Sequence, residues 1–273
     1  MIQIYACLFA TASDLPSNHF AHTQYRQRIF RMTTHLDAIM ESASNALSRM
    51  DYLQCEKHCI HALSMARKQA NWPYYARILL PLQESRRQRR MIAAESTIRL
   101  GTTNLPHAPG QWTNQLAAGC IVITQPHRPT MARLIAEKMQ DRFILALYAE
   151  NTSDCPRWTL SSSPGSTITV TIDAPPRGCI DRWLKPDDRT KFNNKPPDQK
   201  ATLSLPPVRL ASVASNWFLD ACEAMGDAAL AQLAPQDIDV DQIKALESLL
   251  LAMPAHELLH QELGRVARRV ENH

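Results

Sequence analysis

Two histidines four residues apart, His256 and His260, flank Glu257 near the C-terminal end of the sequence. On a helix this spacing places both imidazoles on one face, where they can share a zinc ion. Glu257 can then act as the general base that deprotonates a zinc-bound water. The pattern therefore predicts hydrolytic chemistry, provided that a third protein ligand completes the zinc site.

The spacing His-Glu-x-x-His resembles the zinc-binding helix of metalloproteases, which implies a zinc cofactor. Pro254 places His256 in the first turn of the expected helix, whereas that family holds the pair inside a long helix. A solvated amphipathic helix explains the same residues. We therefore favour no cofactor and no catalytic residue, and we keep as the alternative a zinc-dependent hydrolase that uses His256, Glu257 and His260.

The densest positive charge in the chain is a run of four arginines, which are the predicted partner-binding residues: Arg86, Arg87, Arg89 and Arg90. Such a cluster can bind an acidic protein or phosphates. A solvated helix end, whose cations offset the helix dipole, explains the same cluster. Anion or nucleic-acid binding through Arg86–Arg90 is a further alternative. Nucleic acid is not expected as the partner, because no aromatic residues interleave to stack on bases.

Two cysteines and two histidines within seven residues form a second candidate metal set: Cys55, His58, Cys59 and His61. One helix cannot wrap four ligands around a tetrahedral ion. The two cysteines also fall on the apolar stripe of the expected helix. We therefore interpret them as buried thiols.

The composition indicates a globular protein without a membrane span. The chain has 273 residues, 45% of them hydrophobic and 21% charged, with a net charge of +4. No apolar run reaches the roughly 18 residues that a membrane-spanning helix requires. An odd number of cysteines, seven, favours free thiols in a reducing compartment, so a cytoplasmic location is expected. No membrane partner is expected.

Apolar residues at three- and four-residue steps predict helices in the first third of the chain. The stripe begins at Leu36 and runs to Met50, and a second helix carries Cys55 to Ala66. A third helix is expected to start near Pro73 and to continue towards Ile92. Pro81 should kink or divide this helix, because proline lacks the N–H that the helix needs.

Residues 36–67 resemble a tetratricopeptide repeat, a helical hairpin of 34 residues. The resemblance rests on the turn at residues 50–52 and on Cys55, Cys59 and Ala62 in the second helix. Small side chains at such positions allow two antiparallel helices to approach closely. The sequence departs from the family pattern at four positions: Ile39, Ser42, Ala43 and Arg67. The resemblance implies a role in protein–protein interaction.

The middle of the chain predicts a small sheet. The run 120–124, a helical stretch at 130–140 and the run 143–148 form a strand–helix–strand unit with parallel strands. Residues 167–172 alternate strictly, which indicates an edge or antiparallel strand, and residues 158–161 are a further short strand. His127 and Arg128 precede the helix and could hold an anion, although the glycines of a phosphate-binding turn are absent.

We therefore predict an α+β, mainly helical fold with a protein-interaction or scaffold function, and not an enzyme. Helices are expected to resume near Ser212, with a second beginning at Asp241 and a break at Pro254. The predicted regions are a flexible N-terminal arm at 1–31, tetratricopeptide-like helices at 32–100, a small α/β unit at 118–173, a Pro-rich loop at 174–207 and C-terminal helices at 208–273.

Overall fold

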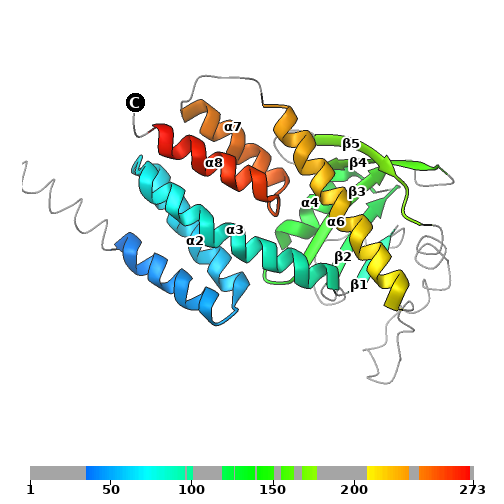
Figure 1. Cartoon of the computed structure of the whole chain (residues 1–273), viewed down its shortest axis with the longest axis horizontal. Coiled ribbons are helices and arrows are strands. Elements are labelled where there is room, and N and C mark those ends of the chain that lie inside the picture. Colours follow the sequence, from blue (N-terminus) through cyan, green and yellow to red (C-terminus); the bar gives the residue numbers. More distant parts are fainter. Residues whose placement is uncertain are drawn as a thin grey trace, which may run out of the picture.

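The computed structural model describes residues 35–95, 97–100, 119–125, 127–138, 140–150, 155–162, 168–176, 208–233 and 240–270. Helices make up one side of this part of the molecule and a five-stranded sheet the other (Figure 1). The α+β, mainly helical fold is thus confirmed. The predicted arm at 1–31 and most of the predicted Pro-rich loop lie outside the described residues.

The helical side consists of a helix over residues 35–48, α2 (Tyr52–Lys68), α3 (Trp72–Glu95), α7 (Val240–Ala252) and α8 (Glu257–Val270). Helix α3 packs against α2 on one flank and α8 on another, and α7 packs against α8. In the described part of the chain, none of the helices combines the length and the apolar character that crossing a membrane demands.

Short turns join the first three helices, as the sequence predicts. Met50 and Ala70 adopt the left-handed backbone conformation, with φ of 59° and 51°. Asp51 then begins α2, because its side chain accepts a hydrogen bond from the backbone N–H of Gln54. Residues 36–67 thus form a helical hairpin, which is the arrangement that the tetratricopeptide resemblance implies.

Pro81 does not divide the third helix, so one of the two outcomes expected from the sequence is wrong. Helix α3 runs unbroken from Trp72 to Glu95 with Pro81 inside it. The cost of an interior proline, about 3 kcal/mol, is offset because Ile78 and Leu82 on either side are buried in the core.

The sheet has the strand order β1-β2-β3-β4-β5. Strands β1 (Thr97–Leu100), β2 (Gly119–Thr124) and β3 (Ile144–Glu150) are parallel, whereas β4 (Arg157–Ser162) and β5 (Ile168–Asp173) continue the sheet in antiparallel fashion. The predicted strand–helix–strand unit and the edge position of β5 are confirmed. Residues 97–100, which were expected to be part of the helical region, instead form an edge strand beside β2.

Helices cover both faces of the sheet (Figure 1). Helix α4 (Pro129–Lys138) packs on one face with Ile121 and Ile123 of β2. Alternate residues of the same strand, Cys120 and Val122, join the large core on the other face. There α6 (Val208–Ala231) and the C-terminal part of α3 pack against the strands. One continuous core therefore joins the helices to the sheet.

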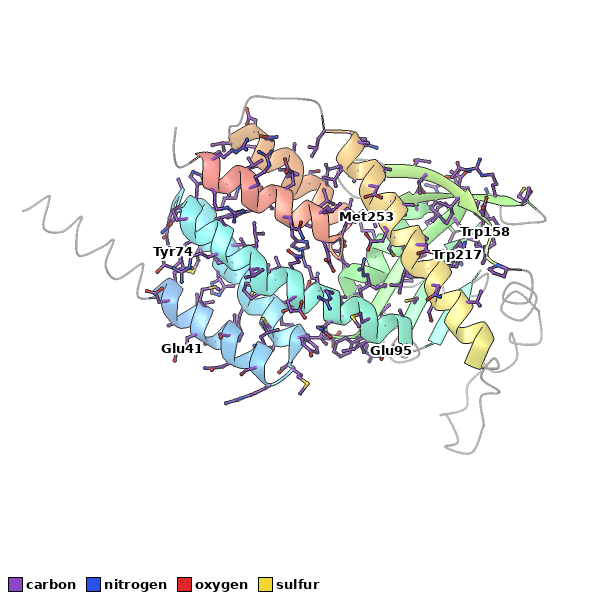
Figure 2. The ribbon with its side chains drawn as sticks, viewed as in Figure 1. Glu41, Tyr74, Glu95, Trp158, Trp217 and Met253 are labelled. Atoms are coloured by element: carbon purple, nitrogen blue, oxygen red, sulfur yellow. The ribbon has the colours of Figure 1, made fainter. Side chains whose placement is uncertain are left out.

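Two tryptophans pack α6 onto the antiparallel strands. Trp158 of β4 is fully buried and meets Trp217 of α6 edge to face, with ring centroids 5.5 Å apart (Figure 2). The indole N–H of Trp217 donates to the carbonyl of Asp173 over 2.8 Å. This packing fixes α6 across the sheet, where its C-terminal half can meet α8.

We predict that Ala62→Leu destabilises the helical side by about 1–3 kcal/mol, because Ala62 has no exposed surface and a larger side chain overpacks the core. Urea unfolding followed by circular dichroism measures the change. Ser64→Leu on the exposed side of α2 is the matched control, expected within about 0.5 kcal/mol of the parent. Equal stability of the two variants would contradict close packing at Ala62.

Candidate functional site: a buried polar network

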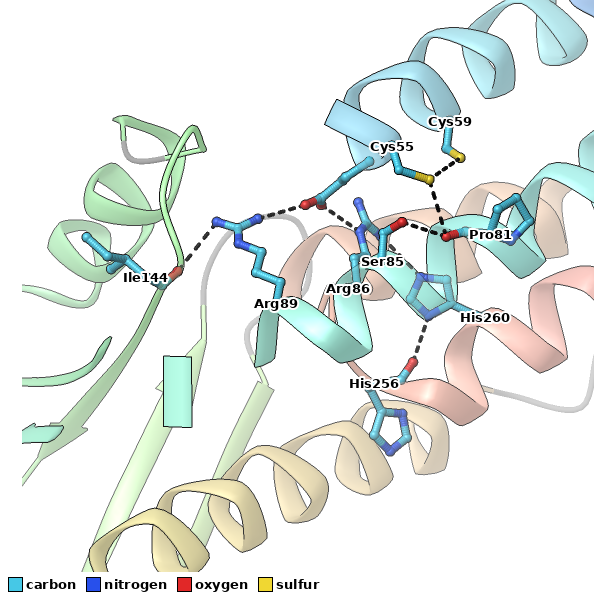
Figure 3. Close-up of polar contacts among 10 residues, drawn as sticks. Cys55, Cys59, Pro81, Ser85, Arg86, Arg89, Ile144, His256 and His260 are labelled. Atoms are coloured by element: carbon cyan, nitrogen blue, oxygen red, sulfur yellow. Dashed lines mark hydrogen bonds and ion pairs between the residues drawn. The ribbon is translucent and has the colours of Figure 1, made fainter. Parts of the chain in front are cut away.

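Glu56 of α2 is a buried carboxylate held by two arginines of α3. Its Oε1 lies 2.9 Å from Nε of Arg86 and its Oε2 lies 3.1 Å from a terminal nitrogen of Arg89. Burial alone would raise the pKa of the Glu56 carboxyl, but the charges and hydrogen bonds of the two arginines outweigh it and lower the pKa. Arg89 also donates to the carbonyl of Ile144 at the start of β3, over 3.4 Å. Glu56 therefore fixes two side chains that reach other elements (Figure 3).

His260 is the next member of the network, and both of its ring nitrogens are engaged. Nε2 lies 3.3 Å from a terminal nitrogen of Arg86, and Nδ1 lies 2.9 Å from the carbonyl oxygen of His256. A guanidinium can only donate and a carbonyl can only accept. Nδ1 must therefore carry the proton and Nε2 must be the acceptor. Burial and the charge of Arg86 lower the pKa of His260 to about 3, so the ring is neutral at pH 7.

His256 immediately precedes α8 and rests on α6. Its side chain is 1% exposed, and Nε2 lies 3.4 Å from a carboxylate oxygen of Glu223 and 3.5 Å from one of Asp227. The ring sits on the bare backbone of Gly226, since a Cβ there would come within 2.1 Å of it. Only glycine leaves room for this imidazole, which explains a glycine inside a helix.

Arg90 and Glu257 close the network between α3, α6 and α8. Arg90 pairs with Glu223 of α6, and its second terminal nitrogen lies 3.9 Å from Glu257 of α8. Arg87 approaches the same Glu257 oxygen to 3.9 Å. Side-chain exposure separates the two arginines, with 13% for Arg90 and 46% for Arg87.

The two histidines of the His-Glu-x-x-His pattern face different helices. The ring of His260 points to Arg86 of α3, and that of His256 points away from it towards α6 (Figure 3). They do not present a shared pair of ligands, and Glu257 lies beside two arginines. As the side chains stand, no three His, Cys, Asp or Glu in the described ranges form a metal-binding group. The zinc-hydrolase alternative stays a prediction, without support from this geometry.

The four predicted partner-binding arginines are not equivalent. Arg86, Arg89 and Arg90 are bound to carboxylates within the chain and have side-chain exposures of 11–13%. This corrects the expectation that all four guanidinium groups are available to a partner or to solvent. Arg87 is the member that faces outwards.

The second candidate metal set separates in the same way. Cys55 and Cys59 are fully buried, with Sγ atoms 4.0 Å apart, which confirms buried thiols. The hydrogen bond to Cys55 and burial raise the pKa of Cys59, so this thiol stays protonated. His58 contacts Gln54 over 3.0 Å, and His61 is exposed.

Four residues of the network were not predicted from the sequence: Glu56, Glu223, Gly226 and Asp227. Two signals were present. Glu56 directly follows Cys55, which belongs to the stripe that was expected to be buried. Gly226 interrupts an otherwise helical pattern. In the predicted anion-binding loop, His127 is buried and Arg128 is exposed, so the two side chains do not face the same surroundings.

In comparisons with known proteins, no family model, no curated protein and no solved structure matches the chain.

We predict that Gly226→Ala destabilises the protein, although alanine favours a helix interior by about 1 kcal/mol. The new Cβ would overlap the His256 ring and force α8 away from α6. The free energy of unfolding in urea measures the effect. Gly264→Ala on α8 is the control, because its Cβ would meet neighbours at an ordinary 3.6 Å and should stabilise the helix. If both substitutions stabilised the protein, the close packing of the His256 ring on Gly226 would be contradicted.

We predict that Glu56→Gln costs about 3–5 kcal/mol of unfolding free energy, because it leaves two buried guanidinium groups without a counter-charge. Glu41→Gln at an exposed position serves as the control and should change stability by less than about 0.5 kcal/mol. Both are compared by urea unfolding at pH 7. If Glu56→Gln lowered the free energy of unfolding by less than about 1 kcal/mol, the ion pairs of Glu56 with the two arginines would not be needed for stability.

Proposed function

We propose that this chain is a non-catalytic protein-interaction module whose contact surface is the outward face of α3. The main support is a stripe of side chains on this face, formed by Leu80, Glu84, Arg87 and Met91. These residues are four, three and four positions apart, and at this spacing they share one face of the helix. Leu80 is 72% exposed and Met91 40%. Large apolar side chains beside a charge are typical of surfaces that bind another protein.

The start of α8 extends this surface. The Arg87–Glu257 contact of 3.9 Å places the start of α8 beside the stripe, and the next residue of α8, Leu258, is half exposed. A partner helix with an apolar face and an acidic residue opposite Arg87 would be complementary. A binding role is proposed because the other three arginines of the cluster, Arg86, Arg89 and Arg90, are bound to carboxylates of the same chain.

Two further observations support this proposal. The hairpin at 36–67 has the helix–turn–helix form that a tetratricopeptide-like scaffold requires. Cys55, Cys59, Cys120, Cys155 and Cys222 are all free thiols, which supports a reducing, cytoplasmic setting. The expected partner is a protein, with no cofactor needed for its binding.

We predict that a photo-crosslinking amino acid at position 80 captures one discrete protein species in cells of the source organism. The same probe at Leu251, an equally exposed leucine on α7, is the matched control and should not capture that species. Adding Arg87→Glu to the position-80 probe should reduce the captured species at least tenfold, because it reverses the only outward charge of the arginine cluster. Mass spectrometry of the crosslinked bands gives the readout.

Identical crosslinking patterns at positions 80 and 251, or a pattern unchanged by Arg87→Glu, would contradict the assignment of this surface. Circular dichroism of each variant shows whether the fold is retained, so that loss of binding is separated from unfolding.

A further inference from the structure

A neutral histidine lies at the centre of the joint between α3 and α8. His260 is 1% exposed. Its Nε2 accepts from Arg86 over 3.3 Å, and its Nδ1–H donates to the His256 carbonyl over 2.9 Å. Protonation would place an N–H on Nε2, opposite a guanidinium that also can only donate. The hydrogen bond that links α8 to α3 is compatible with the neutral ring alone.

Few charges near His260 could compensate an imidazolium. From α3 the facing group is Arg86, a cation, and from α2 it is Glu56, whose oxygens are already taken by two arginines. Immediately before α8, the neighbouring titratable group is His256. No carboxylate in the described part of the chain is shown in contact with His260.

The remaining elements packed on α8 direct their charges elsewhere. On α6, Glu223 and Asp227 lie against His256. On α7, Glu247 is bound by Arg67 and by the hydroxyl of Tyr75, each at 2.6 Å. A proton on His260 would thus bring a second cation beside Arg86 in a buried site.

We propose that His260 is an acid-sensitive lock: protonation of its ring breaks the contact with Arg86 and releases α8 from α3. The α2–α3 pair does not depend on this contact, because Glu56 holds Arg86 and Arg89 independently. The lock opens as a local event at the C-terminal helix before the rest of the helical side unfolds. It stands apart from the proposed binding function and does not require it.

The direction of the pH dependence follows from the histidine's environment. The pKa of His260 is about 3 in the locked state, against an ordinary value of 6.5. A state with α8 released binds a proton that the locked state rejects, so locking is complete above pH 6.5 and weakens as the pH falls towards 3. In this window the opening constant rises about tenfold for each pH unit.

Hydrogen exchange of the full chain at pH 6.5 and 4.5, read by mass spectrometry and corrected for intrinsic exchange rates, tests the lock. The protection of α8 should fall about 50-fold between the two pH values, while that of α2 should change less than threefold. His260→Gln retains an acceptor for Arg86 but cannot titrate, so its α8 protection should be independent of pH. His61→Gln, at an exposed position, should behave as the parent chain.

Unchanged α8 protection in the parent chain, or a fall of about 50-fold that persists in His260→Gln, would overturn the proposal. Should His260→Gln fail to fold, ¹⁵N NMR of the parent imidazoles decides the question. At pH 5 the ring of His260 is expected to be neutral and protonated on Nδ1. A ring already charged at pH 5 in the folded chain would refute the lock.

Discussion

The carboxylate of Glu56 is the group on which the arrangement of the other elements depends. It holds Nε of Arg86 at 2.9 Å, which leaves a terminal nitrogen of the same guanidinium free to reach His260 on α8. It also holds Arg89, which extends to the backbone of Ile144 at the start of β3. A single buried negative charge on α2 thus determines how α3 meets both the C-terminal helix and the sheet. Apolar packing supplies most of the stability, but it is not directional, and these contacts fix the orientation of the helices.

The buried part of the network carries more positive than negative charge. Two guanidinium groups share Glu56, and a third, Arg90, is neutralised by carboxylates that are partly in water. Among the described residues, the nearby carboxylate of Glu56 is already shared by two arginines, so the ring of His260 stays neutral and serves as an acceptor. Gly226 makes room for His256, because the missing side chain lets the imidazole ring lie on the backbone of α6, close to two carboxylates.

Periodicity in the sequence was sufficient for the helices and for most of the sheet. Apolar spacing located α2, α6, α7 and α8, and the alternation at residues 167–172 identified β5 at the sheet edge. Strand β1 was missed because its four residues follow directly after α3 and its partner strand begins nearly twenty residues later. The site was not predictable, because Glu56 and Arg86 are 30 residues apart and neither carries a local sign of its partner. Arg86 to Arg90 were noticed for their charge, but charge density alone does not show which side chains point inwards.

Residue types and their spacing along the chain likewise do not show which way the side chains of the His-Glu-x-x-His pattern point. The same residues can form a zinc site or a structural network. His-Glu-x-x-His specifies a zinc site only when both rings are free to face one ion, and here the helix begins between the two histidines. His256 therefore lies outside the helical turn, and its ring is directed to α6 while that of His260 is directed to α3. Within the described residues, His260 and Glu257 contact arginines of α3, whereas Leu80, Arg87 and Met91 are exposed. The exposed stripe, and not the buried network, is therefore the surface on which the proposed binding role depends.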